Sequence, residues 1–183
     1  MKISMRSRYK VLNPDGIYFI TSSIVNWIPV FTSDKYYSII IENLKFYQKN
    51  EGLKIFAYVL LNNHFHLIVS CKELIKMMQS FKKFTAKEII NNLKEDGKTN
   101  LLLKFHQLKK SYKTTSSHQI WQEGYFPKEM ISIIELRQKI DYMHLNPIRK
   151  GYVKNPEDWV YSSATDYLTN RKGLIELDIN LLG

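Results

Sequence analysis

Cysteine, glycine and proline are all scarce in this chain of 183 residues, which has one Cys, seven Gly and five Pro. Cys71 has no second cysteine for an internal disulfide, and it provides no cysteine cluster of the kind that binds structural zinc. The low glycine and proline content, together with 44% hydrophobic residues, excludes a low-complexity, disordered or fibrous chain. The sequence therefore predicts a single domain over residues 1–183 that is stabilised by packing.

Long hydrophobic runs are missing as well. No stretch reaches the ~18 consecutive apolar residues that a membrane span needs. Residues 1–9 are basic and lack the apolar core of a signal peptide. We therefore expect a cytoplasmic protein with no membrane partner.

Acidic residues are outnumbered, with 17 Asp and Glu against 27 Lys and Arg, which gives a formal charge of +10. Residues 72–113 contain eleven Lys and four acids and so contribute +7 of this total. A polyanion such as a nucleic acid is a natural partner for this segment. Lysines that merely solvate helix faces would give the same charge, so charge alone does not decide between these interpretations.

Hydrophobic periodicity predicts a mixed α and β fold. β-branched and aromatic runs predict strands at Ile17–Val25, Lys54–Leu61 and His64–Ser70 and a fourth within Ile120–Met130; apolar stripes predict helices over 35–50, Lys72–Lys94 and from a Ser132 cap to about Leu145. Residues 96–117 are polar and lysine-rich, and we expect a loop there. This order predicts an α+β, ferredoxin-like or RRM-like sandwich, an antiparallel sheet with helices packed on it. The core covers about 9–150, and 151–183 is an extension that packs back on it.

Two residue pairs have the spacing of a site. His64 and His66 alternate in a predicted strand, so both imidazoles point to one face and form half of a metal site. Tyr142 and Asn146 are four residues apart near a helix end and share a face, where the Asn146 amide oxygen could complete the site. Solvated strand histidines, a packing tyrosine and an Asn-Pro helix stop explain the same residues without any site.

Four segments of the chain resemble a known family, and they occur in the same order as in that family. The segment LLNNHFHLIV (60–69) is similar to the His-hydrophobic-His motif of the HUH endonucleases, and IDYMHLNPIRKGYV (140–153) resembles their single-tyrosine transposase signature. IWQEGYF (120–126) and PEDWVYSSATDY (156–167) are similar to segments of the REP-associated tyrosine transposase branch, relatives of the small insertion-sequence transposases that act on single-stranded hairpin DNA. The resemblance extends from about Tyr9 to Tyr167.

The resemblance implies a role for each matched residue. Tyr142 would be the nucleophile, and His64, His66 and Asn146 would bind a divalent cation, Mg²⁺ or Mn²⁺. Many insertion-sequence relatives have glutamine where this chain has the shorter Asn146, so water could complete the ligand set. Mixed imidazole and oxygen ligands suit Mn²⁺, whereas Mg²⁺ prefers oxygen, and zinc also accepts two histidines.

The implied reaction is nicking and strand transfer of single-stranded DNA through a 5′-phosphotyrosine intermediate. A free phenol has a pKa near 10, so forming phenolate at pH 7 costs about 4 kcal/mol unless a cation or base assists. Candidate phosphate and base contacts are Lys82, Lys83, Lys87, Lys109, Lys110, Lys113, Tyr112 and Trp121. Trp121 is equally interpretable as a core residue.

Two other functions fit the same residues. A non-catalytic, domesticated module that binds single-stranded nucleic acid would need only the basic charge and the aromatics, whereas a metal-dependent hydrolase would not need Tyr142. The sequence does not decide between a monomer and a homodimer that exchanges the tyrosine helix.

Overall fold

The computed structural model describes residues 11–112, 116–125 and 127–179. Its strands are β1 (Tyr18–Ser23), β2 (Lys54–Leu60), β3 (His64–Ser70) and β4 (Lys128–Glu129). Its α-helices are α1 (Asp34–Glu51), α2 (Leu74–Glu95), α3 (Thr99–Gln107), α4 (Ile133–His144), α5 (Asn146–Arg149) and α6 (Ala164–Leu168). A short 3₁₀ turn, η1 (Val25–Trp27), follows β1, and a second, η2 (Pro156–Asp158), follows α5.

The four strands form one antiparallel sheet in the order β2-β3-β1-β4. Because β3 lies between β1 and β2, the connection from β1 through α1 to β2 crosses over β3. This arrangement is the ferredoxin-like topology, and the predicted α+β fold is confirmed.

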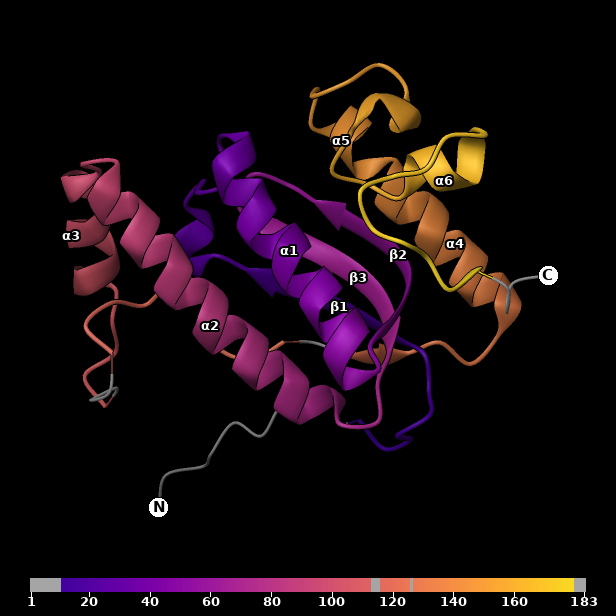
Figure 1. Cartoon of the computed structure of the whole chain (residues 1–183), viewed down its shortest axis with the longest axis horizontal. Helices are drawn as coiled ribbons and strands as arrows, with labels where there is room; N and C mark the ends of the chain where they lie inside the picture. The colour runs from indigo at the N-terminus through magenta and orange to yellow at the C-terminus, as the bar shows by residue number, and fades with distance from the viewer. Residues whose placement is uncertain (1–10, 113–115, 126, 180–183) are drawn as a thin grey trace.

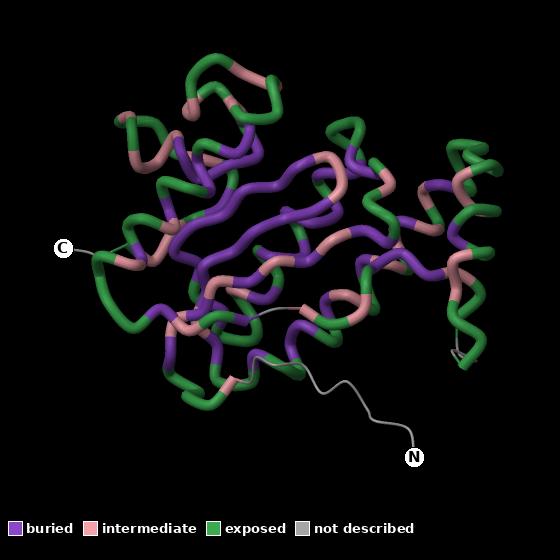
Figure 2. Tube along the Cα trace, turned by 180° about the vertical axis from the view of Figure 1, so that it is seen from behind, coloured by how far each residue is buried: buried purple, intermediate pink, exposed green. Residues whose placement is uncertain are grey.

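Helices cover both faces of the sheet (Figure 1). Phe65, Leu67 and Val69 of β3 pack into the cluster that contains the buried residues of α1 and α2. Ile68, which points to the other face, packs into a second cluster with Ile140 of α4 and its helical neighbours. Seen from the side opposite to Figure 1, the strands form a buried band through the molecule (Figure 2). The alternation of β3 therefore places its even-numbered residues on the α4 side.

The segment predicted as a loop contains a helix. Residues 99–107 form α3, which packs on α2 and buries Phe105 completely. Gly97 ends the preceding turn with a φ of 63°, a conformation that glycine adopts without strain. The loop prediction was wrong because Leu101, Leu102 and Phe105 form an apolar stripe that is short and surrounded by lysines.

The predicted fourth strand is much shorter than Ile120–Met130. Of the described residues in this segment, only Lys128 and Glu129 pair with β1 as a strand, while Trp121 makes a single bridge to Ile24. Asn146 lies just beyond the end of α4, after Leu145, as Pro147 predicted, and it begins the short α5. The described part of the extension packs against β2, where the Trp159 indole donates to the Leu60 carbonyl at 2.9 Å. Among the described residues, no helix has both the length and the apolar content to cross a bilayer.

Candidate functional site

The two histidines of β3 lie on the α4 face of the sheet. His64 and His66 are 7% and 6% exposed, and their ring centroids are 5.0 Å apart. The strand alternation brings the rings to one face, but this face is covered by α4 rather than solvated. Two buried imidazoles side by side are costly to desolvate without a purpose, which makes them candidate ligands.

The Nδ1 atom of each ring already has a partner. His64 Nδ1 lies 2.6 Å from Asn63 Oδ1, and His66 Nδ1 lies 2.7 Å from Thr21 Oγ1. A carbonyl oxygen can only accept, so His64 donates from Nδ1 and its Nε2 keeps a lone pair. This tautomer is the one that metal-binding histidines use, with the second ring nitrogen held by a neighbouring acceptor.

Burial keeps both rings neutral. Desolvation lowers the pKa of His64 to about 4, with a further contribution from Lys150. Desolvation likewise lowers the pKa of His66 to about 3, and the nearby His64 and Lys139 act in the same direction. At neutral pH both imidazoles are therefore neutral, which is the form that ligates metals.

Tyr142 of α4 comes to these histidines from the same chain. Its ring centroid lies 6.0 Å from that of His66, and the residue remains 39% exposed. Two cations pack over the tyrosine ring, with Lys139 Nζ at 5.0 Å and Arg149 Cζ at 5.3 Å. The phenol is thus accessible to a large substrate and is surrounded by positive charge, and no second copy is needed to pair it with the histidines.

Asn146 is buried, and its Nδ2 donates to the Tyr142 carbonyl at 3.0 Å. This bond fixes the amide and leaves Oδ1 as the atom suited to a cation. Among the described residues, no group of three or more His, Cys, Asp and Glu side chains could hold a metal. His64 and His66 bring two neutral imidazoles together on one face. Asn146, at the start of α5, carries an amide oxygen that would add an oxygen donor, and such a mixed nitrogen and oxygen set would fit a divalent cation that also takes water or phosphate oxygens.

The predicted DNA contacts are spread over the molecule. Lys83 and Lys87 are exposed on α2, which packs on the sheet face away from Tyr142, and Lys109 is half-buried at the end of α3. Lys113 lies outside the described residues.

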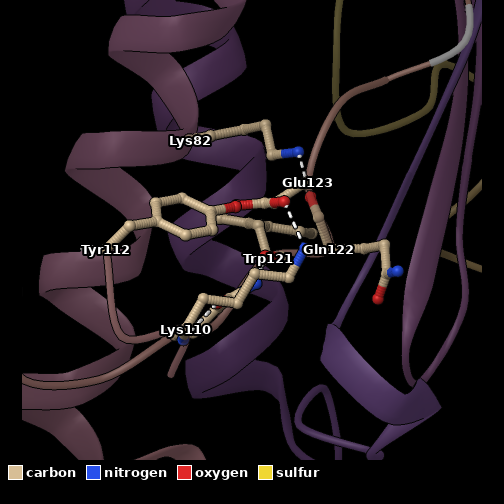
Figure 3. A network of polar contacts seen from close by, with 7 residues as sticks. Lys82, Lys110, Tyr112, Trp121, Gln122 and Glu123 are labelled. Carbon is tan, nitrogen blue, oxygen red and sulfur yellow. Dashed lines mark hydrogen bonds and ion pairs between the residues drawn. The ribbon is translucent and has the colours of Figure 1, made fainter. Parts of the chain in front are cut away.

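Lys82, Lys110 and Tyr112 belong to one polar network (Figure 3). Lys82 Nζ donates to the carbonyls of Gln122 and Gly124 at 2.8 and 2.6 Å. Lys110 pairs with Glu123 at 2.5 Å, and the Tyr112 hydroxyl donates to the same carboxylate. These three side chains therefore hold residues 122–124 in place.

Trp121 requires a correction. It is 6% exposed, its ring packs on Phe65 and Phe31, and its indole donates to Thr85 Oγ1 at 3.1 Å. A ring packed in this way has no face for an unpaired base, so Trp121 is a core residue. Sequence alone did not distinguish the two roles because aromatic side chains serve both.

The cations nearest to the tyrosine were missed by the sequence analysis. Lys139, Arg149 and Lys150 surround Tyr142 and His64, whereas the sequence placed the phosphate contacts in the densest run of lysines. A signal was available, because Lys139 precedes Tyr142 by three residues and so lies on the same helix face. The high density of lysines in and after α2 instead favoured the prediction of phosphate contacts there.

Comparison with known proteins confirms the resemblance. The chain is 21% identical over 164 residues to the REP-associated tyrosine transposase of Escherichia coli (strain K12), a match covering 89% of this chain and 84% of that protein. It also superposes on the solved structure of a REP-associated tyrosine transposase bound to a REP hairpin, with a TM-score of 0.60 and 18% identity over 96% of both chains. No model of a known protein family matches the chain.

Proposed function

We propose that this chain is a tyrosine transposase-type enzyme that nicks and rejoins single-stranded DNA at hairpin or repeat sequences. The single observation that supports this best is the 6.0 Å separation of the Tyr142 and His66 rings, within a site that also contains His64. The similarity to the REP-associated tyrosine transposases supports the same proposal, including a DNA hairpin as the partner. Tyr142 is the proposed nucleophile.

The proposed reaction is a phosphoryl transfer to the phenol. Tyr142 Oη attacks the phosphorus, the bond from phosphorus to the 3′-oxygen breaks, and a 5′-phosphotyrosine ester forms. The phenol loses one proton and the departing 3′-oxygen gains one. Because the ester retains the energy of the broken bond, attack by another 3′-hydroxyl in the reverse direction joins strands without ATP. Lys139 and Arg149, which contact the tyrosine ring, are placed to neutralise charge on the phosphate.

His64, His66 and Asn146 are the proposed ligands of Mg²⁺ or Mn²⁺. When bound, the cation supplies Lewis-acid stabilisation of the charge that develops on the phosphate oxygens. Asn63 and Thr21 contact the Nδ1 atoms of the two rings, so Nε2 is the proposed ligating atom of each ring. Asn146 also anchors the backbone of Tyr142 through its Nδ2, so one side chain links the proposed ligand set to the nucleophile.

The test is a covalent adduct. Purified protein is mixed with end-labelled hairpin DNA that has a single-stranded extension, in the presence of Mn²⁺, and analysed on a denaturing gel. We expect a protein–DNA adduct that Tyr142→Phe abolishes while leaving DNA affinity within about twofold. Tyr47→Phe is the matched control, because it removes the hydroxyl of a tyrosine on α1, on the other face of the sheet.

The other functions predict different outcomes. Tight DNA binding with no adduct in any metal would show a non-catalytic binding module. Strand cleavage that persists in Tyr142→Phe and needs metal would show a hydrolase that activates water. Either result would overturn the proposal.

A further inference from the structure

A hollow of about 490 Å³ lies beside the tyrosine–histidine site. Phe19, Thr21 and Ser23 of β1 line it, and in the antiparallel pairing they face Ile68, His66 and His64 of β3. Since alternate strand residues share a face, the hollow is on the same side of the sheet as the two histidines. Its volume falls within the range of about 300–1,000 Å³ that is typical of small-ligand sites. We refer to it as the Trp27 hollow, after the aromatic residue at its edge.

Trp27 is held in an exposed and strained position. It is 58% exposed, and its φ of 55° follows a φ of 56° at Asn26, so two successive non-glycine residues are left-handed. Such strain persists only where the surroundings hold it, and it is concentrated at functional sites. Here Asn63 holds it, because its Nδ2 donates to the Trp27 carbonyl at 2.8 Å while its Oδ1 contacts His64. The same asparagine therefore positions a proposed metal ligand and an exposed indole.

The Trp27 hollow shares a wall with the nucleophile. Lys139 Nζ lies 4.6 Å from the Phe19 ring inside the hollow and 5.0 Å from the Tyr142 ring outside it. A nucleotide with its phosphate at Tyr142 would have this cation between that phosphate and the hollow. The Trp27 ring lies 5.3 Å from the His64 ring, which lies 5.0 Å from the ring of His66, the neighbour of Tyr142. This run of rings leads from the nucleophile to the indole, where the neighbouring nucleotide of the same strand would lie.

The opposite rim offers polar groups at a fixed position. Residues 122–124 line the hollow, and the network of Lys82, Lys110 and Tyr112 fixes them. In Figure 3 the Gln122 side chain points away from Lys110 and Tyr112, so its amide is not part of their contacts. Glu123 is engaged by Lys110, which leaves the Gln122 amide as the group suited to a base edge.

We propose that the Trp27 hollow binds one unpaired nucleobase of the DNA strand, next to the phosphate at Tyr142. Trp27 stacks on the base, and the Gln122 amide hydrogen-bonds its edge. An aromatic ring beside a positively charged groove is the usual arrangement for holding single-stranded bases. The inference rests on the proposed function only in placing a phosphate at Tyr142. It adds Trp27 as the residue that determines which base of the DNA strand is held.

The experiment is abasic scanning in Tyr142→Phe protein, where no covalent step occurs. Hairpin DNA with a single-stranded extension is prepared with one abasic site at each extension position in turn, and affinity is measured by fluorescence anisotropy. We expect one position whose base loss weakens binding about tenfold. With Trp27→Ala added, intact DNA binds about tenfold more weakly and that position shows no further loss. Trp27→Phe keeps an aromatic ring, so in this variant the abasic site at that position should still weaken binding.

Phe84→Ala is the matched control, because Phe84 is 51% exposed on α2, on the other side of the sheet. This variant is expected to keep the abasic profile unchanged. Gln122→Ala is expected to keep the stacking but to abolish discrimination among the four bases at the sensitive position. Equal affinity for all four bases in Tyr142→Phe protein would remove the role given to Gln122.

An abasic profile that is the same with and without Trp27, or no measurable binding of any single-stranded extension, overturns the inference. Failure of the adduct assay leaves this result unaffected, since the scan requires binding and no chemistry. The two proposals can therefore fail separately.

Discussion

Thr21 Oγ1 lies 2.7 Å from His66 Nδ1, across the antiparallel pairing of β1 with β3. The two residues are direct partners in the register, so the hydroxyl holds the ring from a neighbouring strand rather than from a flexible loop. Partners of this kind usually set the orientation of a metal-binding imidazole.

Replacing Thr21 with valine keeps the shape of the side chain and removes this contact. We expect Mn²⁺ affinity to fall about 10- to 100-fold, because His66 loses the group that orients it. Isothermal titration with Mn²⁺ measures the change. Thr99→Val, at the start of α3, is the control and should leave affinity unaltered. Equal affinities for the Thr21 variant and the unmodified protein would exclude His66 as an oriented ligand.

Metal and DNA should bind cooperatively. The proposed ligands are neutral, and Lys139 and Lys150 are close enough to act on the histidines, so a dication alone is poorly compensated. A DNA phosphate supplies the missing negative charge. We expect Mn²⁺ to bind at least tenfold more tightly with hairpin DNA present, and DNA affinity to rise by the same factor with Mn²⁺. Electron paramagnetic resonance of free Mn²⁺, using Tyr142→Phe protein, tests this. Independent binding would contradict the site.

Acid should destabilise the metal-free protein through its buried histidines. Desolvation lowers the pKa of His64 to about 4, of His66 to about 3 and of His144 to about 4. In the unfolded state these rings have pKa values near 6.5, so below that pH the unfolded state binds more protons than the folded state. The free energy of unfolding therefore falls as the pH is lowered, until the pH reaches the pKa values of the folded state.

Chelator-treated protein should therefore have a constant free energy of unfolding well above pH 7. Below pH 6 that free energy should fall with a slope approaching about 1.4 kcal/mol per pH unit for each of the three rings. Urea titrations at several pH values measure it. His144→Gln removes one ring and should reduce the slope by up to one third. An unchanged slope in that variant would mean that His144 is not protonated on unfolding.

The cations beside Tyr142 should contribute more to DNA affinity than the lysines of α2. Lys139→Gln should weaken binding of single-stranded DNA and reduce the slope of log affinity against log salt by about 0.7, which corresponds to one phosphate contact. Lys83→Gln, on the other sheet face, should leave the slope nearly unchanged. Anisotropy titrations between low and moderate salt compare the two. Equal losses would show that the DNA also contacts α2.

Trp121 should contribute to the free energy of unfolding and not to the affinity for DNA. Trp121→Ala removes a buried ring that packs on Phe65, and we expect a loss of about 3–5 kcal/mol in urea unfolding. Tyr112→Ala, at a residue that is 64% exposed, should change stability by about 0.5 kcal/mol or less. DNA affinity per folded molecule should be unchanged in Trp121→Ala. A selective loss of affinity would restore Trp121 as a base contact.

Local patterns were sufficient for the regular elements. Alternation in HFHLIV sets both the strand and the common face of the histidines, since side chains of a strand alternate by two. Ser132 and Glu135 predicted the start of α4, and the Ser132 side chain does accept from the Glu135 backbone. Residues 99–107 were misjudged because a nine-residue helix depends on packing against α2 more than on its own periodicity.

The sequence by itself determined the antiparallel hairpin of β2 and β3, the shared face of His64 and His66, and the helical placement of Tyr142 and Asn146, because each follows from neighbours within a few residues. Only the tertiary structure decided that α4 covers the histidine face, that Lys139 and Arg149 surround the phenol, and that Trp121 is core while Trp27 is exposed. These features depend on which distant surfaces meet when apolar area is buried, and residue type and spacing leave that choice open.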